Sequence, residues 1–279
     1  MPNPLSKAGT ARIGAPQGAA AASCGTAARW RSIDWNAAKA RVRRLQMSIA
    51  KAVSLKHWRK VRALQRMLTH SFAARALAVK KVAENAGART PGVDKKLWRS
   101  DKAKMQAVEA LRRRGYRPRP LRRIHIPKKN GQTRPLSIPT MHDRAMQALH
   151  ALALAPIAET RGDPNSHGFR EGRRCADAIG QCFIALAKTY SAEWVLEADI
   201  QACFDEISHQ WLLNHIPMDK RLLRLWLQAG YIEQEALHPT QAGTPQGGII
   251  CQRPPALPFG QRLRPLAISL RSVRHYWRT

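Results

Sequence analysis

The chain has 279 residues, of which 44% are hydrophobic, and it carries a formal net charge of +30. This length and apolar content suffice to bury the core of one large domain or two modest ones. No apolar run approaches the roughly eighteen residues that span a bilayer. We therefore expect neither a membrane protein nor a membrane partner. The five cysteines form no Cys-x-x-Cys pair, so we expect reduced thiols in a cytoplasmic chain.

Positive charge is concentrated in the first half of the chain. Residues 1–150 contain 34 Lys and Arg against 6 Asp and Glu, whereas residues 151–250 contain 8 against 12. Residues 251–279 add 6 basic residues and no acidic ones. A basic first half of this size is typical of proteins that bind a polyanion, and it predicts a nucleic-acid partner.

The N-terminal third is expected to begin without regular structure and to continue as helices. Residues 1–30 are rich in Ala, Gly and Pro and lack the apolar centre of a signal peptide, so we predict a disordered segment. Asp34 is a candidate helix N-cap, and apolar residues then recur at helical spacing with Arg and Lys between them. Residues 34–85 are therefore predicted to form a basic helical module whose apolar faces turn inward.

A two-stranded β-hairpin is predicted next. Ile124 and Ile126 alternate as in a strand, Asn130-Gly131 favours a tight turn, and residues 133–139 form the second strand. The two prolines of the second strand indicate an exposed or edge strand. Basic residues near the turn can reach outward to phosphates, although an exposed basic hairpin is as often a solvated edge.

Helices alternate with one strand in the rest of the recognisable pattern. Residues 193–200 are mainly apolar and predict a buried strand, and residues 238–250 form a glycine-rich loop. The tail after residue 250 has no clear periodicity. Helical patterns occupy four stretches, namely 141–159, the second part of 165–187, 208–216 and 219–231.

An acidic cluster follows the predicted buried strand. Asp199 lies at the end of that strand, where a carboxylate is costly unless it is paired or binds a cation. Asp205 and Glu206 follow closely, and clustered carboxylates can hold the divalent ions that serve phosphoryl transfer. For Asp205 and Glu206 the preferred interpretation is a favourable position at a helix N-terminus. For Asp199 the metal interpretation is preferred.

Seven segments, in order, carry a resemblance to a known family. They are SIDW…VRRLQ, TPGVD, LRRIHIPKKNGQTRPLSIPT, DRAMQAL, NSHGFREGRR, EADIQACFDEISHQWLL and GTPQGGII. In this order they resemble the proteins encoded by bacterial group II introns, which are reverse transcriptases with maturase function. The resemblance implies an α+β fold, with a basic helical N-terminal module followed by the fingers and part of the palm of a right-hand polymerase.

The resemblance implies a metal site and a sugar-selecting residue in the palm. Asp199 matches the first metal-binding aspartate, and the main-chain carbonyl of Ile200 would be a neighbouring ligand. The implied ion is Mg²⁺. Phe204 matches the bulky residue under the incoming sugar, whose ring would exclude a 2′-hydroxyl and so favour deoxynucleotides.

The resemblance also implies contacts to the incoming nucleotide and to RNA. Lys128 and Arg134 match the fingers residues that grip the triphosphate, although Lys129 could replace Lys128 because the sequence does not fix the hairpin register. Gln246 matches a residue beside the nucleotide pocket. Implied partners are group II intron RNA, template RNA, a DNA primer or target, and a deoxynucleoside triphosphate. The candidate RNA-binding residues are Arg112, Arg113, Arg114, Arg122 and Arg123.

The sequence departs from the family pattern after Ile250. The family continues with Ser-Pro, an apolar helix and a Tyr-x-Asp-Asp hairpin, whereas the tail is basic, rich in Pro and Arg, and free of acidic residues. We predict that this tail is a shifted reading frame and that the palm is truncated. The expected organisation is a disordered segment 1–30, a helical RNA-binding module 31–100, fingers and partial palm 101–250, and an aberrant tail 251–279.

Two classes of function stay open. The first is an RNA-directed DNA polymerase, a nucleotidyltransferase of intron mobility and RNA splicing, which would be inactive here without the second carboxylate motif. The second is a non-catalytic RNA-binding fragment that keeps its affinity for intron RNA. A generic basic RNA-binding protein of the ribosomal kind would require the seven ordered motifs to be coincidental.

Overall fold

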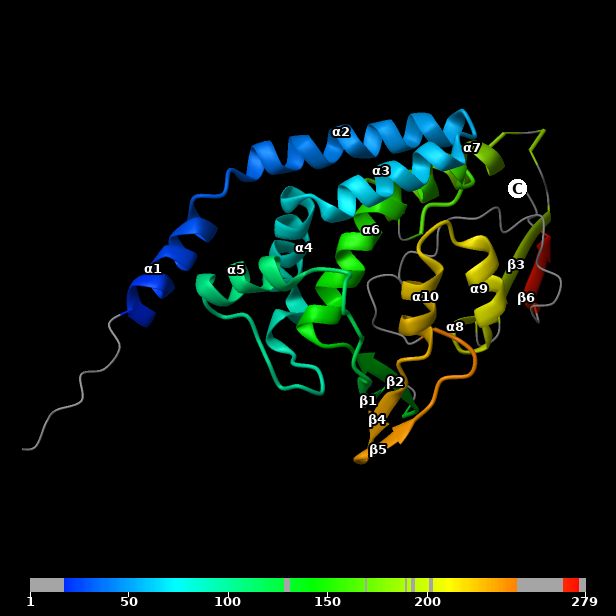
Figure 1. Cartoon of the computed structure of the whole chain (residues 1–279). Coiled ribbons are helices and arrows are strands. Elements are labelled where there is room, and N and C mark those ends of the chain that lie inside the picture. The colour runs from blue at the N-terminus through cyan, green and yellow to red at the C-terminus, as the bar shows by residue number, and fades with distance from the viewer. Residues whose placement is uncertain are drawn as a thin grey trace, which may run out of the picture.

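The structure is a computed structural model that describes residues 18–127, 131–168, 170–188, 190–191, 194–200, 203–244 and 268–275. Helices make up most of the first half of the chain, and two small sheets follow in the second half. Figure 1 shows the helices of the first half lying together, with the larger sheet at one end of this group.

Three helices form the predicted basic module, namely α2 (Trp35–Ser54), α3 (Trp58–His70) and α4 (Phe72–Glu84). Asp34 caps α2, because its carboxylate accepts the backbone N–H groups of Asn36 and Ala37, each at 2.9 Å. The prediction of this cap and of a helical module is confirmed. Helix α4 begins at Phe72 because the Ser71 hydroxyl caps it.

Residues 18–30 differ from the prediction of disorder. They belong to α1 (Gly18–Arg31), which packs against α5 (Asp101–Ala110). Trp30 is buried, and the Lys104 ammonium of α5 lies 5.7 Å from its ring centre. An alanine-rich segment is also a good helix former, and its partner helix lies far along the chain, where local composition does not reveal it. The same prediction for residues 1–17 lies outside the described residues.

Helix α6 (Met141–Arg161) is the centre of the hydrophobic core. It packs against α2, α3 and α4, and it buries Met146, Leu149 and Ile157 almost completely. Two later helices, α9 (His209–His215) and α10 (Lys220–Leu227), add Leu212 and Leu223 to the same cluster. The core therefore extends across the boundary that we expected at residue 100.

The predicted hairpin is confirmed. Strands β1 (Leu121–Pro127) and β2 (Thr133–Ile138) pair antiparallel, from Arg122 opposite Ile138 to Pro127 opposite Thr133. Gly131, just before β2, has φ = +79°, a left-handed conformation that favours glycine. Strand β2 lies at the edge of the sheet, as its prolines predicted.

The hairpin is part of a larger sheet, which corrects the prediction of an isolated two-stranded finger. Strands β4 (Tyr231–Glu233) and β5 (Ala236–His238) extend it in the order β2-β1-β4-β5, and β1 pairs parallel with β4. The β4–β5 turn places Gln234 and Glu235 at φ = 47° and 66°. These residues give no glycine turn signal, so sequence reasoning missed this second hairpin.

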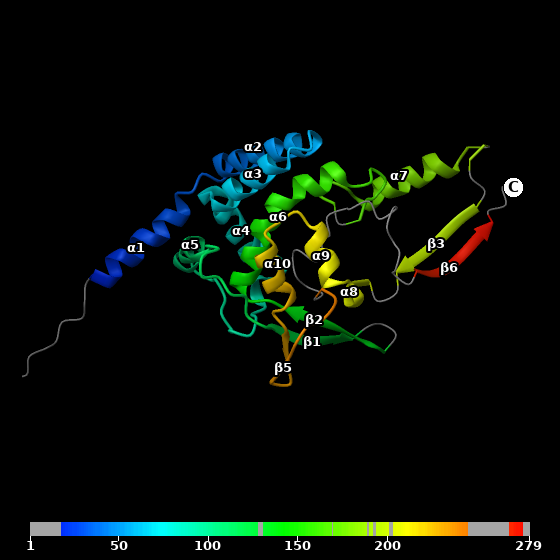
Figure 2. The same ribbon diagram turned by 45° about the vertical axis from the view of Figure 1, so that its right-hand side comes forward.

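A 3₁₀ turn, Ala86–Arg89, follows α4. Helix α7 (Cys175–Leu186) forms within the stretch where a helix was expected, and the short α8 (Cys203–Glu206) precedes the predicted helix 208–216. Strand β3 (Trp194–Ile200) pairs antiparallel with β6 (Ile268–His275). Figure 2 shows α7 and this strand pair extending away from the other helices.

Two expectations about the strand pair change. The tail was expected to lack a regular pattern, yet β6 forms within it, because pairing with β3 supplies backbone partners that periodicity does not reveal. Strand β3 was predicted to be buried, but Trp194 at its start is 63% exposed. The α+β fold class is confirmed. Within the described parts of the chain, no helix has the length and apolar character to cross a membrane.

Candidate nucleic-acid interface

Exposed cations cover the outer faces of α2 and α3. The apolar faces of these helices are buried through residues such as Ile49 and Leu68, so the basic residues between them face solvent. The result is a long basic surface on the helical part of the molecule, suited to a polyanion. Its exposed members are Lys39, Arg41, Arg43, Arg44, Lys51, Arg59, Lys60, Arg62 and Arg66.

A buried carboxylate ties the start of the hairpin to α6. Asp143 accepts hydrogen bonds from the Tyr116 hydroxyl and the Thr140 hydroxyl, each at 2.6 Å, and from the Arg119 backbone N–H at 3.3 Å. The Trp226 indole N–H of α10 donates in turn to the Tyr116 hydroxyl at 2.9 Å. Burial and the neighbouring charge of Asp143 raise the pKa of Tyr116, so the phenol stays protonated as a donor. This network fixes the chain that enters β1.

Arg144 joins α6 to the loop before α5. Its guanidinium donates to the carbonyls of Pro139 at 2.9 Å, Gly87 at 2.7 Å and Thr90 at 2.5 Å. A side chain at Gly92 would put a Cβ atom 2.7 Å from the backbone of the residue that caps α6, so only glycine fits this close approach. The segments TPGVD and DRAMQAL therefore hold the hairpin against the helical core, a positioning role that sequence reasoning missed.

The hairpin register separates its arginines onto two faces. Arg122 and Arg134 share a face, since they lie opposite Ile138 and Ile126 respectively and side chains alternate along a strand. Arg134 is exposed near the turn, as a phosphate-gripping role requires. Nε of Arg122 is buried without a hydrogen-bond partner in the described structure.

Arg123 lies on the other face and has partners inside the protein. Its guanidinium stacks 3.4 Å from the ring centre of Tyr231 and donates to the Ser137 hydroxyl at 3.3 Å. These residues and Asp205 line a cavity of about 360 Å³ between the hairpin, α8 and residues 239–244. The cavity combines a cation, a carboxylate and hydroxyl groups beside the loop that leads to Gln246. Gln246 itself and Lys128 and Lys129 lie outside the described residues.

The backbone places Asp199 at the carboxyl end of β3. Its partner across the sheet is Ser269, and Ile200 lies opposite Ile268. Strand β6 contains no Asp or Glu, so the strand paired with β3 brings no second carboxylate to Asp199. Among the residues whose side chains are described, no three His, Cys, Asp or Glu groups gather as a metal site would require.

The three arginines after α5 have different surroundings. Arg113 forms an ion pair with Asp219 at 2.5 Å, so part of its guanidinium is engaged within the protein. Nε of Arg112 donates to the Glu109 carbonyl at 3.0 Å, and the rest of its guanidinium is available to a ligand. All three arginines are exposed, but only Arg113 has an acidic partner. Of this trio, Arg112 and Arg114 are the stronger candidates for contact with nucleic acid.

Known proteins match most of this chain. Residues 30–111 match the N-terminal domain of reverse transcriptase, and residues 126–251 match reverse transcriptase (RNA-dependent DNA polymerase). Group II intron-encoded protein LtrA of Lactococcus lactis subsp. cremoris is 35% identical over 184 residues, which cover 62% of this chain and 30% of that protein. This chain belongs to the group II intron reverse transcriptase/maturase family.

Further similarities define how much of the family is present. Protein YkfC of Escherichia coli (strain K12) is 34% identical over 192 residues, which cover 63% of this chain and 49% of that protein. This family member therefore spans between 30% and 49% of the length of the two relatives. A solved structure titled "Partial Cas6-RT-Cas1--Cas2 complex" matches 67% of this chain and 32% of its own chain, with 19% identity and a TM-score of 0.39. Polymerases in general use divalent metal ions for nucleotidyl transfer.

Proposed function

We propose that this chain binds RNA through its basic helical part and carries the fingers and first palm strand of a group II intron reverse transcriptase/maturase. The family activity is RNA-directed DNA synthesis, in the service of intron mobility and RNA splicing. The observation that carries this proposal is the order of its parts: an exposed basic helical surface precedes a hairpin that presents Arg134, and two reverse transcriptase matches cover the same order.

RNA is the principal partner in this proposal. The cations of α2 and α3 would contact phosphates of group II intron RNA and of a template, without reading sequence. Arg134, with Lys128 or Lys129, would grip the triphosphate of a deoxynucleotide, and Gln246 would lie beside it. Bidentate contacts from a guanidinium to phosphate oxygens suit this role. A DNA primer or target would complete the substrate set.

The palm residues keep the roles that the resemblance implies, but the metal site among them is incomplete. Asp199 and the carbonyl of Ile200 would hold Mg²⁺, and Phe204 would lie under the sugar. Two-metal chemistry needs carboxylates from separate strands. Ser269 is the residue opposite Asp199, and no acidic residue lies on β6, so the residues present do not fit a complete metal site.

This mismatch favours a second candidate, a non-catalytic RNA-binding protein of the same family. Primer extension on an RNA template with Mg²⁺ separates the two candidates, with Asp199→Ala as the matched control. We expect no DNA synthesis by this chain alone. Synthesis that disappears in the variant would demonstrate a complete site and support the polymerase. Synthesis that persists in the variant would indicate a contaminating enzyme.

RNA binding is tested by affinity measured against salt concentration. Because each neutralised phosphate releases counterions, the logarithm of the binding constant should fall steeply with the logarithm of salt concentration. Charge reversal at Arg112 and Arg114 should weaken binding, and Arg113 should be left intact because its pairing with Asp219 would confound the result. Affinity that does not change with salt would refute the proposed RNA-binding surface.

A further inference from the structure

A cavity of about 280 Å³ lies where α3, α4 and α6 meet the turn after α5. None of the roles proposed above uses it as a binding site. Its floor is apolar, because Leu111, Met146 and Leu149 line it and are themselves almost completely buried. Its rim carries four arginines, of which Arg75 and Arg112 are the most relevant. A cavity with an apolar floor and a cationic rim suits a ligand with one flat apolar part and one anionic part.

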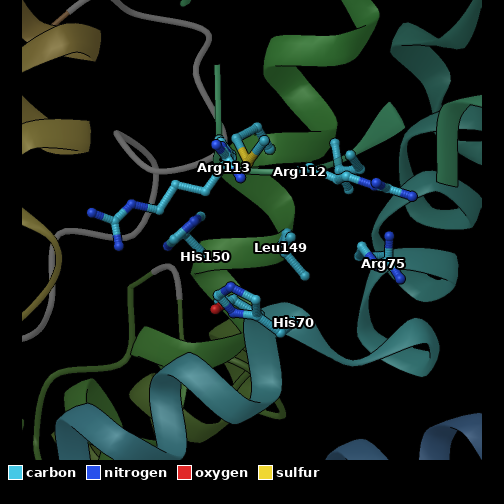
Figure 3. Close-up of a pocket in the computed structure, with 10 residues that line it drawn as sticks. His70, Arg75, Arg112, Arg113, Leu149 and His150 are labelled. Carbon is cyan, nitrogen blue, oxygen red and sulfur yellow. The ribbon is translucent and has the colours of Figure 1, made fainter. Parts of the chain in front are cut away.

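The side chains that line the cavity lie in two groups. Figure 3 shows Arg75 and Arg112 on one side of Leu149, and His70 and His150 on the other. Arg113 extends away from Arg75 and Arg112, in keeping with its ion pair to Asp219. The charged part of a ligand would therefore lie on the arginine side and its uncharged part on the imidazole side.

The arginine side has unused capacity for an anion. Nε of Arg75 is buried without a hydrogen-bond partner in the described structure, although one Nη donates to the Val108 carbonyl at 3.3 Å. Burial and repulsion from Arg112 lower the pKa of Arg75, with Glu109 acting in the opposite direction. A bound phosphate would place negative charge beside the Arg75 and Arg112 guanidinium groups and relieve the repulsion between them.

The imidazole side is suited to a nucleobase and not to a second negative charge. Burial is the main cause that lowers the pKa of His150 to about 4, so the ring is neutral at pH 7 and offers one donor and one acceptor. No hydrogen bond joins His150 to another described residue, and its ring meets Trp226 edge-on at 5.6 Å. Nδ1 of His70 donates a hydrogen bond to the Arg66 carbonyl at 2.8 Å, which leaves Nε2 available.

We propose that this cavity binds one unpaired nucleotide of a bound RNA, with the phosphate at Arg75 and Arg112 and the base against His70 and His150. Unpaired bases are commonly recognised in this way, by stacking on His and Arg and by hydrogen bonds to the base edge. The inference deepens the proposed RNA-binding function and rests on it, because it names the part of the RNA that leaves the basic surface and enters the protein.

The test uses uridine 5′-monophosphate as probe and follows the imidazole NMR signals of His70 and His150 in the full chain. We expect a saturable shift of both signals. Uridine lacks the phosphate and inorganic phosphate lacks the base, so each should bind roughly tenfold more weakly, a loss of about 1.4 kcal/mol. Phosphate that binds as tightly as the nucleotide would overturn the proposal and reduce the cavity to an anion site.

Three variants make the test specific. Arg112→Gln removes an exposed rim charge, and His150→Phe keeps a flat ring beside Trp226 while it removes both ring nitrogens. Each should weaken nucleotide binding by roughly tenfold. Arg221→Gln removes one exposed arginine of α10 that does not line the cavity, and it should not change nucleotide binding. Equal losses in Arg221→Gln and Arg112→Gln would overturn the proposal.

The nucleotide titration is independent of the test for RNA binding. A chain that binds RNA with steep salt dependence but shows no shift with uridine 5′-monophosphate would refute the nucleotide cavity and leave the proposed function standing. A chain that binds the nucleotide in this cavity without measurable affinity for RNA would refute the proposed RNA-binding function and leave only a nucleotide-binding cavity. His150→Phe should be checked for folding by circular dichroism, and Arg112→Gln gives the answer if that variant is unstable.

Discussion

Helices α6 and α7 are both rich in apolar residues but have opposite environments. Helix α6 buries twelve residues and packs against α2, α3 and α4, whereas α7 buries none. Ile179, Phe183 and Ile184 of α7 are each more than 60% exposed. An apolar helix gains stability only where its apolar side chains are buried against a neighbouring element. Apolar periodicity in the sequence does not show whether such a neighbour exists.

The same contrast separates the two sheets. The four-stranded sheet is tied to the core through Asp143 and through Arg144, both buried. The β3–β6 pair has only two strands, and a two-stranded sheet is marginally stable by itself in water. The region that holds the hairpin and basic helices is therefore expected to be the rigid part of the molecule, and the region with Asp199 the less stable part.

Core truncation should give the largest difference between the two regions. Ile49→Ala removes a fully buried side chain of α2 and should lower the free energy of unfolding by about 2–5 kcal/mol. Ile184→Ala in α7 removes the same atoms from a side chain that is 63% exposed, and it should change that free energy by less than about 0.5 kcal/mol. Urea unfolding measures both. Equal losses would mean that α7 is covered in solution.

Loss of the Arg144 contacts should be next in size. Arg144→Met keeps the aliphatic stem but leaves three backbone carbonyls without a hydrogen-bond donor. The free energy of unfolding should therefore fall by about 3 kcal/mol. Arg43→Met, on the exposed face of α2, is the matched control and should be nearly neutral. Hydrogen exchange should accelerate in residues 86–94 in the Arg144 variant. Unchanged exchange there would contradict the role of Arg144 as the link between loop and helix.

Acid should destabilise the core through His150. Its pKa lies near 4 in the folded chain against an ordinary 6.5, chiefly because of burial, with Arg113 and His70 adding to the shift and Asp219 opposing it. The unfolded chain therefore binds the proton first, and stability should fall as pH drops from 6.5 through 4. By pH 5 this contribution amounts to about 2 kcal/mol. His150→Phe should lack it, and identical pH profiles for the two proteins would contradict this assignment.

The hairpin turn should give the smallest effect. Gly131→Ala forces a side chain into a left-handed conformation and should cost about 1 kcal/mol, with faster hydrogen exchange confined to residues 121–138. Gly25→Ala, in α1 with open space around it, should instead stabilise its helix slightly. A Gly131 effect spread over the whole protein would mean that the hairpin does not open independently of the core.

Local signals in the sequence predicted the elements that depend on neighbours along the chain. Asp34 predicted the start of α2, the Asn130-Gly131 pair predicted the first hairpin, and the prolines of β2 predicted an edge strand. Each of these signals acts within a few residues, through a cap, a turn conformation or a missing N–H group. Sequence resemblance added the family, because seven ordered motifs are far more specific than any single one.

Only the tertiary structure decided how these elements meet. The pairing of β1 with β4, the contact of α1 with α5, and the Asp143 network join residues that are distant in sequence, so no local pattern encodes them. The cavity between His150 and Arg75 is likewise assembled from three helices and a turn. Long-range packing selects such contacts because burying apolar surface and pairing buried polar groups are properties of the whole fold, not of any one segment.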